Sequence, residues 1–108
     1  NISAAEVEMG LETHPEVLAC GVFGVPSEMT EEEVMACVVP RPGASLTAPA
    51  LAVHAAGRMA RFMVPRYIRF MAALPKNHAE RVQKFELRDE AVTPDAWDRE
   101  AHGYKVRR

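Results

Sequence analysis

The sequence predicts an α+β domain, a small three-stranded sheet flanked by helices. Apolar residues recur with the helical period in some segments and with the strand period in others. Proline, glycine and charged turns separate these segments, so that the order is helix, two strands, helix, strand, helix. At 108 residues such a pattern forms one domain around a single core.

The first helix is predicted from its cap. Ser3 and Glu6 have the spacing of a capping box, and Val7 and Leu11 lie on one helical face. We expect a helix of about eleven residues that ends before Pro15.

Two strands follow this helix. Residues 17 to 25 are apolar at both alternating positions, which is typical of a strand buried on both faces. Pro26 and the glutamates at 31 to 33 predict an exposed turn before a second strand at 34 to 40.

A second helix and a third strand complete the predicted core. The helix begins after Thr47, tolerates Pro49 in its first turn and runs through Arg58. Pro65 stops a short helical segment, and residues 67 to 72 alternate as the third strand.

The last predicted helix is basic. Arg81, Lys84 and Arg88 are spaced by three and four, so we expect them to share one helical face. On spacing alone, such a stripe is usually a solvated face and carries no function.

The predicted domain covers residues 1 to 88, and residues 89 to 108 form a polar C-terminal tail. Trp97 and Tyr104 are the residues that we expect to order part of this tail.

Composition excludes several classes of protein. The chain is 48% hydrophobic and 26% charged, which is typical of a globular domain and not of a disordered one. No apolar run approaches the roughly 20 residues of a membrane span, and no secretory leader is recognisable. We therefore expect a cytoplasmic domain, and the opening Asn1 indicates a fragment of a longer chain.

The net charge of −2 hides an asymmetry along the chain. Residues 1 to 40 carry eight carboxylates and no Lys or Arg, whereas residues 41 to 88 carry nine Lys or Arg. Two explanations remain open: the basic segment faces a phosphate-bearing ligand, or it packs against the acidic helix. Nucleic acid is not expected as a partner, because the total charge is not basic and aromatic residues do not interleave with the cations.

The sequence shows no self-contained catalytic site. Cys20 and Cys37 lie in apolar runs and favour a reduced domain, although a bridge between neighbouring strands stays open. The four histidines lack metal-ligand spacing, and there is no phosphate-binding glycine loop and no Ser or Cys nucleophile beside a His and an acid. Any chemistry must be shared with a partner domain.

One segment nevertheless resembles a catalytic loop. From Leu74 to Arg88 the chain is similar to the Leu-Pro-Lys-Thr-x-x-Gly-Lys-[Ile/Val]-x-[Arg/Lys]-x-x-Leu-Arg motif of the AMP-forming acyl-CoA synthetases, a superfamily shared with adenylation domains and luciferases. In that family the Lys after Gly reaches the substrate carboxylate and the α-phosphate. Here Glu80 stands at the Gly position and Arg81 at the Lys position.

Further motifs of the family follow in the same order. Residues 1 to 8 resemble Gly-x-x-Ile-x-Pro-x-Glu-[Val/Ile]-Glu, and residues 14 to 17 match His-Pro-x-Val. Residues 21 to 26 and 63 to 68 are similar to Val-x-Gly-x-Pro and [Lys/Met]-[Val/Ile]-Pro-x-x-[Ile/Phe]. Residues 93 to 100 resemble the tails of carnitine- or crotonobetaine-CoA-ligase-like members.

The resemblance implies a mobile C-terminal domain that shows two faces to a large N-terminal domain of the same polypeptide. At the adenylating face, Arg81 is the implied catalytic cation and Lys76 a ligand-binding residue, with Lys84 a weaker stand-in. Arg81 either does the work of the usual lysine or marks a member with slow adenylation. At the thioester-forming face, Asn1, Ile2 and Ser3 would line the CoA tunnel, and the alternative for Ser3 is a helix N-cap alone.

The implied reaction joins a carboxylic acid to CoA with cleavage of ATP to AMP and pyrophosphate. ATP and CoA are then substrates, Mg²⁺ is held by the large domain, and the isolated fragment is inactive. The fragment also exposes surface or a sheet edge that the large domain would meet, so we expect the fragment to pair as a homodimer at high concentration. The alternative function is a non-catalytic binding or assembly module that has lost adenylation.

Overall fold

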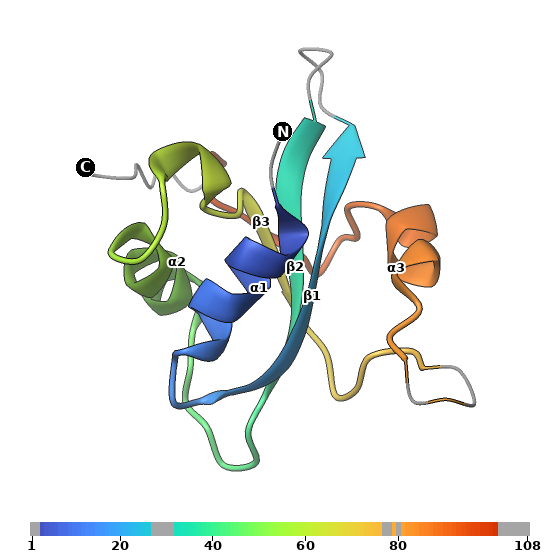
Figure 1. Ribbon diagram of the computed structural model, residues 1–108, viewed down its shortest axis with the longest axis horizontal. Helices are drawn as coiled ribbons and strands as arrows, with labels where there is room; N and C mark the ends of the chain where they lie inside the picture. The colour runs from blue at the N-terminus through green and yellow to red at the C-terminus, as the bar shows by residue number, and fades with distance from the viewer. Residues whose placement is uncertain (1–2, 27–31, 77–78, 80, 102–108) are drawn as a thin grey trace.

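The computed structural model describes residues 3–26, 32–76, 79 and 81–101, and it shows a four-stranded sheet with helices on both faces (Figure 1). The strands are β1 (Val17–Pro26), β2 (Glu32–Pro40), β3 (Tyr67–Phe70) and β4 (Trp97–Asp98). The helices are α1 (Ala4–Glu12), α2 (Ala48–Ala56), the short 3-10 helix η1 (Arg61–Met63) and α3 (Lys84–Glu90). Within these residues, no helix is long and apolar enough to cross a membrane.

The strands lie in the order β1-β2-β3-β4. β1 and β2 are antiparallel, with Gly21 opposite Cys37. β2 and β3 are parallel, because α2 and η1 carry the chain back to the starting end of the sheet. β4 returns antiparallel to β3, so β1 and β4 are the two edges of the sheet.

The predicted α+β class is correct, but the predicted number of strands is wrong. The fourth strand comes from the segment expected to be a polar tail, where Trp97 and Asp98 pair with Ile68 and Tyr67. A strand of two residues is too short to show an alternating pattern. Its strand conformation therefore depends on pairing with β3 and could not be predicted from its own sequence. Trp97 also packs against the core, while Tyr104 lies outside the described residues.

The sheet separates two apolar layers. The first layer holds α1 and α2 against the sheet, with buried residues Val7, Leu11, Val22, Ala36, Leu51, Ala55 and Ile68 among its members. The second layer contains Phe23, Val25, Met35, Cys37, Tyr67, Leu74 and Leu87. Neighbouring residues of β1 and β2 thus point into different layers, which confirms the predicted burial on both faces for Cys20, Val22, Phe23 and Val25, whereas Leu18 is 50% exposed.

Both long helices begin at the predicted caps. Ser3 Oγ accepts a hydrogen bond from the Glu6 N–H at 3.3 Å, and Thr47 Oγ1 accepts one from the Ala50 N–H at 3.3 Å. Each helix has nine residues and is shorter than predicted, so that α2 ends at Ala56 and excludes Arg58.

The start of α3 corrects a second prediction. The helix begins at Lys84, so Arg81 lies in the preceding loop and does not share a helical face with Lys84 and Arg88. The three-and-four spacing is a necessary condition for a shared face, but it does not itself make the residues helical.

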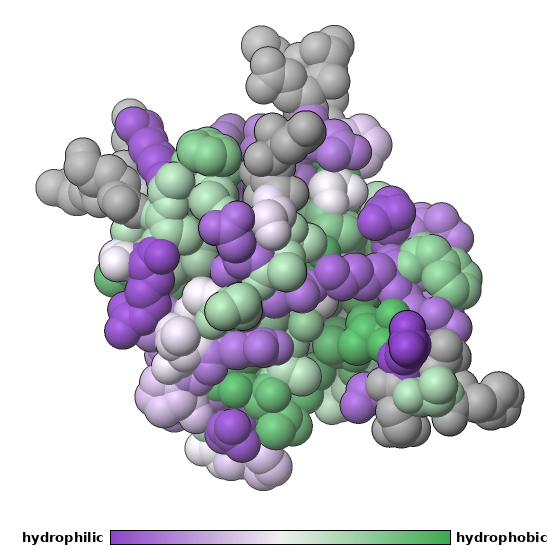
Figure 2. Space-filling view, in the orientation of Figure 1, coloured by the Kyte–Doolittle hydropathy of each residue, from purple (hydrophilic) through white to green (hydrophobic). Residues whose placement is uncertain are grey.

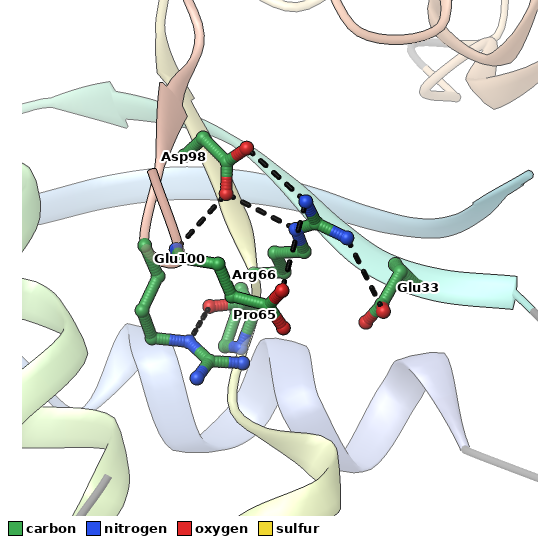
Figure 3. A network of polar contacts seen from close by, with 6 residues as sticks. Glu33, Pro65, Arg66, Asp98 and Glu100 are labelled. Atoms are coloured by element: carbon green, nitrogen blue, oxygen red, sulfur yellow. Dashed lines mark hydrogen bonds and ion pairs between the residues drawn. The ribbon is translucent and has the colours of Figure 1, made fainter. Parts of the chain in front are cut away.

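Arg66 attaches the last strand to the sheet (Figure 3). Its Nε donates to Asp98 Oδ1 at 3.0 Å and its Nη2 to Asp98 Oδ2 at 3.3 Å, while Nη1 donates to Glu33 Oε2 at 3.4 Å. Glu100 Oε1 lies 3.7 Å from Nη2, and the Arg99 N–H donates to the Arg66 carbonyl at 2.8 Å. One guanidinium, on the residue before β3, thus connects β2, β4 and the segment after β4.

The Arg66 network makes a pH-dependent contribution to stability. Partial burial alone would raise the pKa of the Asp98 carboxyl, but the hydrogen bonds from Arg66 and from the Glu100 N–H outweigh it and lower the pKa below its ordinary value. A lowered carboxyl pKa adds stability above the ordinary value of about 4, and this stability is lost as the pH falls through the lowered pKa.

We therefore expect Asp98→Asn to lower the free energy of unfolding by about 1–2 kcal/mol at pH 7. Urea titrations at several pH values measure this, and the difference from wild type should shrink as the pH falls below about 4. Asp89→Asn, which removes an exposed carboxylate from α3, is the matched control. A pH-independent difference for Asp98→Asn would contradict the account.

Candidate functional site

The loop that contains the candidate catalytic residue is closed at its base. Lys76 and Val82 form an antiparallel bridge, and the Gln83 N–H donates to the Pro75 carbonyl at 2.8 Å. Leu74, just before the loop, is buried in the second apolar layer. The two ends of the loop therefore lie side by side on the sheet.

Arg81 lies next to this closure, directly before Val82, and its side chain is exposed. Lys76, at the other end of the loop, is also exposed. The structure thus brings these two predicted site residues to one loop, as the motif implied. Glu80 lies outside the described residues.

The loop base and α3 lie over Gly21 of β1. A Cβ on Gly21 would lie 3.7 Å from both Val82 Cγ1 and Leu87 Cδ1, which is ordinary van der Waals contact. The segment that follows Arg81 therefore packs directly on the edge strand.

An ion pair connects the start of α3 to α1. Lys84 Nζ pairs with Glu8 Oε2, and the same oxygen accepts a hydrogen bond from the Val22 N–H at 2.8 Å. Through this pair, the acidic helix α1 contacts the basic segment directly. Packing of the basic segment against the acidic helix was one of the two explanations of the charge asymmetry. The Lys84 ammonium is therefore engaged within the domain.

The predicted thioester face lies on the other layer of the sheet. Ser3 caps α1, and α1 packs in the first layer, whereas Leu74 and Leu87 on either side of the loop belong to the second. The structure confirms the capping role of Ser3. It does not bring Ser3 together with Lys76 and Arg81, and Asn1 and Ile2 lie outside the described residues.

An open cleft beside the start of α1 was not predicted. Its volume is about 1020 Å³, and its lining includes Ala4, Phe23, Glu32, Arg61, Phe62 and Arg99. Five separate parts of the chain supply these residues, so no local motif could have signalled it. Its walls carry both signs of charge and an exposed aromatic ring.

The two cysteines are free thiols on opposite faces of the sheet, since Cys20 lies in the first layer and Cys37 in the second. Burial, with the Glu12 and Glu8 carboxylates, raises the pKa of the Cys20 thiol to about 12. Burial also raises the pKa of Cys37 to about 11, although the nearby Arg69 guanidinium acts in the opposite sense. Neither thiol is a thiolate nucleophile at neutral pH.

We expect both thiols to be unreactive in the folded chain. At pH 8 an aromatic disulfide reagent should label neither, and two equivalents should react in guanidinium, because unfolding removes the burial that raises each pKa. A Met9→Cys variant, which places a thiol where the side chain is 69% exposed, is the positive control. One rapid equivalent in the native wild-type chain would disprove this expectation.

No group of three His, Cys, Asp or Glu in the described part of the chain could hold a metal ion. No buried side-chain nitrogen or oxygen among these residues lacks a hydrogen-bond partner. The described residues thus offer exposed cations on a closed loop, and not a metal centre or a covalent nucleophile.

This small α+β fold resembles the C-terminal domain of adenylate-forming ligases. The family described as AMP-binding enzyme C-terminal domain matches residues 6–81. The chain belongs to this family.

Relatives of known name agree with this assignment. The mitochondrial medium-chain acyl-CoA ligase ACSF2 of Danio rerio is 38% identical over 89 residues, which are 82% of this chain and 15% of that protein. ATP-bound MatB from Rhodopseudomonas palustris superposes with a TM-score of 0.79 at 32% identity, over 82% of this chain and 18% of that one. The amide bond synthetase McbA from Marinactinospora thermotolerans gives 0.80 at 30% identity, over 86% and 19%. The chain therefore spans less than a fifth of the length of each.

Proposed function

We propose that this chain is the mobile C-terminal domain of an ATP-dependent acyl-CoA ligase, which converts a carboxylic acid, ATP and CoA into acyl-CoA, AMP and pyrophosphate. Family membership and the names of the acyl-CoA ligase relatives support this proposal. The choice of CoA as acceptor rests on those relatives, since one structural neighbour is named an amide bond synthetase. ATP, CoA and Mg²⁺ would be bound mainly by the large N-terminal domain.

The position of Arg81 carries the proposal. It is an exposed cation beside the bridge that closes the loop, so it can reach out from the domain while the base stays fixed. During adenylation the carboxylate attacks the α-phosphorus, negative charge builds on the oxygens of both groups, and pyrophosphate leaves. A guanidinium delivered by a docking domain would stabilise that charge and help to exclude water.

The two layers of the sheet support a second role after a rotation. Arg81 and Lys76 belong to the loop that packs with the second layer, and Ser3 starts the helix of the first. A domain built in this way can present the loop in the first half-reaction and the start of α1 in the second. Asn1, Ile2 and Ser3 would then lie at the thioester-forming face.

In the intact ligase, we expect Arg81→Ala to slow adenylation on the order of a hundredfold, because one transition-state donor is removed. Acid-dependent exchange of pyrophosphate into ATP measures this half-reaction. Capture of a supplied acyl-adenylate by CoA measures the other, which should change little. Arg81→Lys should retain more activity than Arg81→Ala, since the charge survives.

Arg58→Ala is the matched control, because it removes an exposed arginine that follows α2, far along the chain from the loop. It should leave pyrophosphate exchange near the wild-type rate. Wild-type exchange in Arg81→Ala would refute the role of Arg81 and make Lys76 the next candidate.

The isolated 108-residue chain should fold but should neither bind ATP tightly nor form an acyl-adenylate, because it has no phosphate-binding glycine loop. Calorimetric titration with ATP tests this, with the intact ligase as the positive control. Micromolar ATP binding by the chain alone would overturn the expectation. Pairing of the isolated chain into a homodimer through its sheet edge stays a prediction.

A further inference from the structure

The Glu8 carboxylate lies at a junction of three elements. It belongs to α1, accepts the Val22 N–H of the edge strand β1 at 2.8 Å, and pairs with Lys84 at the start of α3. α1 and α3 cover opposite layers, so this contact passes around the edge of the sheet. Figure 2 shows hydrophilic side chains across the surface between α1 and α3, with hydrophobic surface directly below them.

This contact differs from an ordinary surface ion pair. The side chain of Glu8 is only 20% exposed and that of Lys84 32% exposed. The carboxylate is held from two sides, by a backbone N–H and by an ammonium, which fixes its orientation. Partly buried, hydrogen-bonded pairs lose more when one partner is removed than exposed pairs do.

The contact acts on the segment that contains Arg81. Lys84 is the first residue of α3, and this helix has no side-chain N-cap. Its start is held instead by Glu8 and by the packing of Val82 and Leu87 on Gly21. Val82 directly follows Arg81 and pairs with Lys76, so a shift of the start of α3 would move the base of the loop.

We propose that Glu8 is a positioning residue for adenylation, which acts through Lys84 to hold the Arg81 loop in its productive place. This inference rests on the proposed function. Glu8 does not touch the reacting atoms, and it lies on the helix of the opposite layer. The two faces of the domain are thereby connected through one carboxylate at the sheet edge.

The informative variant is Glu8→Gln. Glutamine keeps the size of the side chain and an oxygen that can accept the Val22 N–H, but it loses the charge that holds Lys84. In the intact ligase, pyrophosphate exchange should show a kcat lower by about tenfold to a hundredfold, because a misplacement of a catalytic group by about 1 Å can cost on the order of a hundredfold. The KM for ATP should stay within about twofold of wild type, because the loop acts on the transition state and not on ATP binding. The rate at which CoA captures supplied acyl-adenylate should also stay within about twofold, because the loop is not used in that half-reaction.

Matched variants separate positioning from loss of fold. Glu12→Gln removes a carboxylate one turn later on α1, where the side chain contacts Cys20 Sγ, and it should leave exchange unchanged. Lys84→Arg should retain most of the activity, and Lys84→Met should fall as far as Glu8→Gln. The double variant Glu8→Gln with Lys84→Met should be no slower than either single variant, because both remove the same contact. Thermal melts confirm that each variant is folded.

The Arg81→Ala background tells the two proposals apart. If Arg81→Ala is slow and Glu8→Gln adds no further loss to it, Glu8 acts through Arg81 as proposed. If Arg81→Ala is slow but Glu8→Gln alone exchanges pyrophosphate at the wild-type rate, the positioning role is refuted and the proposed function stands. If Arg81→Ala itself has no effect, the proposed role of Arg81 fails and the inference fails with it. Equal slowing of both half-reactions by Glu8→Gln would show a general structural role instead and would also refute the inference.

Discussion

The burial of β1 and β2 on both faces is the constraint on which the rest of this domain depends. Successive side chains of a strand point to opposite sides, so Val22 and Phe23 each need a separate apolar cover. α1 and α2 supply one cover, and Leu74, Leu87 and their neighbours supply the other. The loop before α3 and the cap of α1 therefore lie on different layers, because the sheet has two apolar faces.

The edge of that sheet creates a second requirement. An edge strand exposes backbone N–H and C=O groups, which natural proteins cover with charged side chains or neighbouring elements. Here the carboxylate of Glu8 takes the Val22 N–H and also holds Lys84, so the group that covers the edge is the group that fixes the start of α3. At the other edge, Arg66 performs a comparable task, since its guanidinium attaches Asp98 and so the two-residue strand β4. Both edges depend on charged groups far apart in the sequence.

The sequence predicted those features whose causes are local. The side-chain oxygens of Ser3 and Thr47 accept hydrogen bonds from N–H groups three residues later, and the apolar run of β1 predicts burial on both faces. It could not predict β4, because Trp97 and Asp98 are strand residues only through pairing with Tyr67 and Ile68. For the candidate site, the motif pointed to the loop and to Arg81 as candidates. Residue spacing could not predict the bridge that closes the base of the loop or the ion pair between Glu8 and Lys84 at the start of α3. The helical face expected for Arg81, Lys84 and Arg88 failed because the bridge at Val82 keeps the chain extended until Gln83.

Arg81 stands where the resembling motif has lysine, and this difference changes how accurately the backbone of the loop must be placed. An ammonium on a flexible stem is a compact charge that can rotate its donors toward a developing anion from many directions. A guanidinium is a planar fork, and its advantage on a carboxylate or phosphate depends on the approach angle, because the two parallel hydrogen bonds form only when the planes align. The backbone that carries an arginine must therefore be placed more accurately than one that carries a lysine. On the proposed role of Arg81, the Lys76 bridge at the loop base and the Glu8 to Lys84 contact would supply that accuracy, and the identity of residue 81 would then be connected to a carboxylate on the opposite layer of the domain.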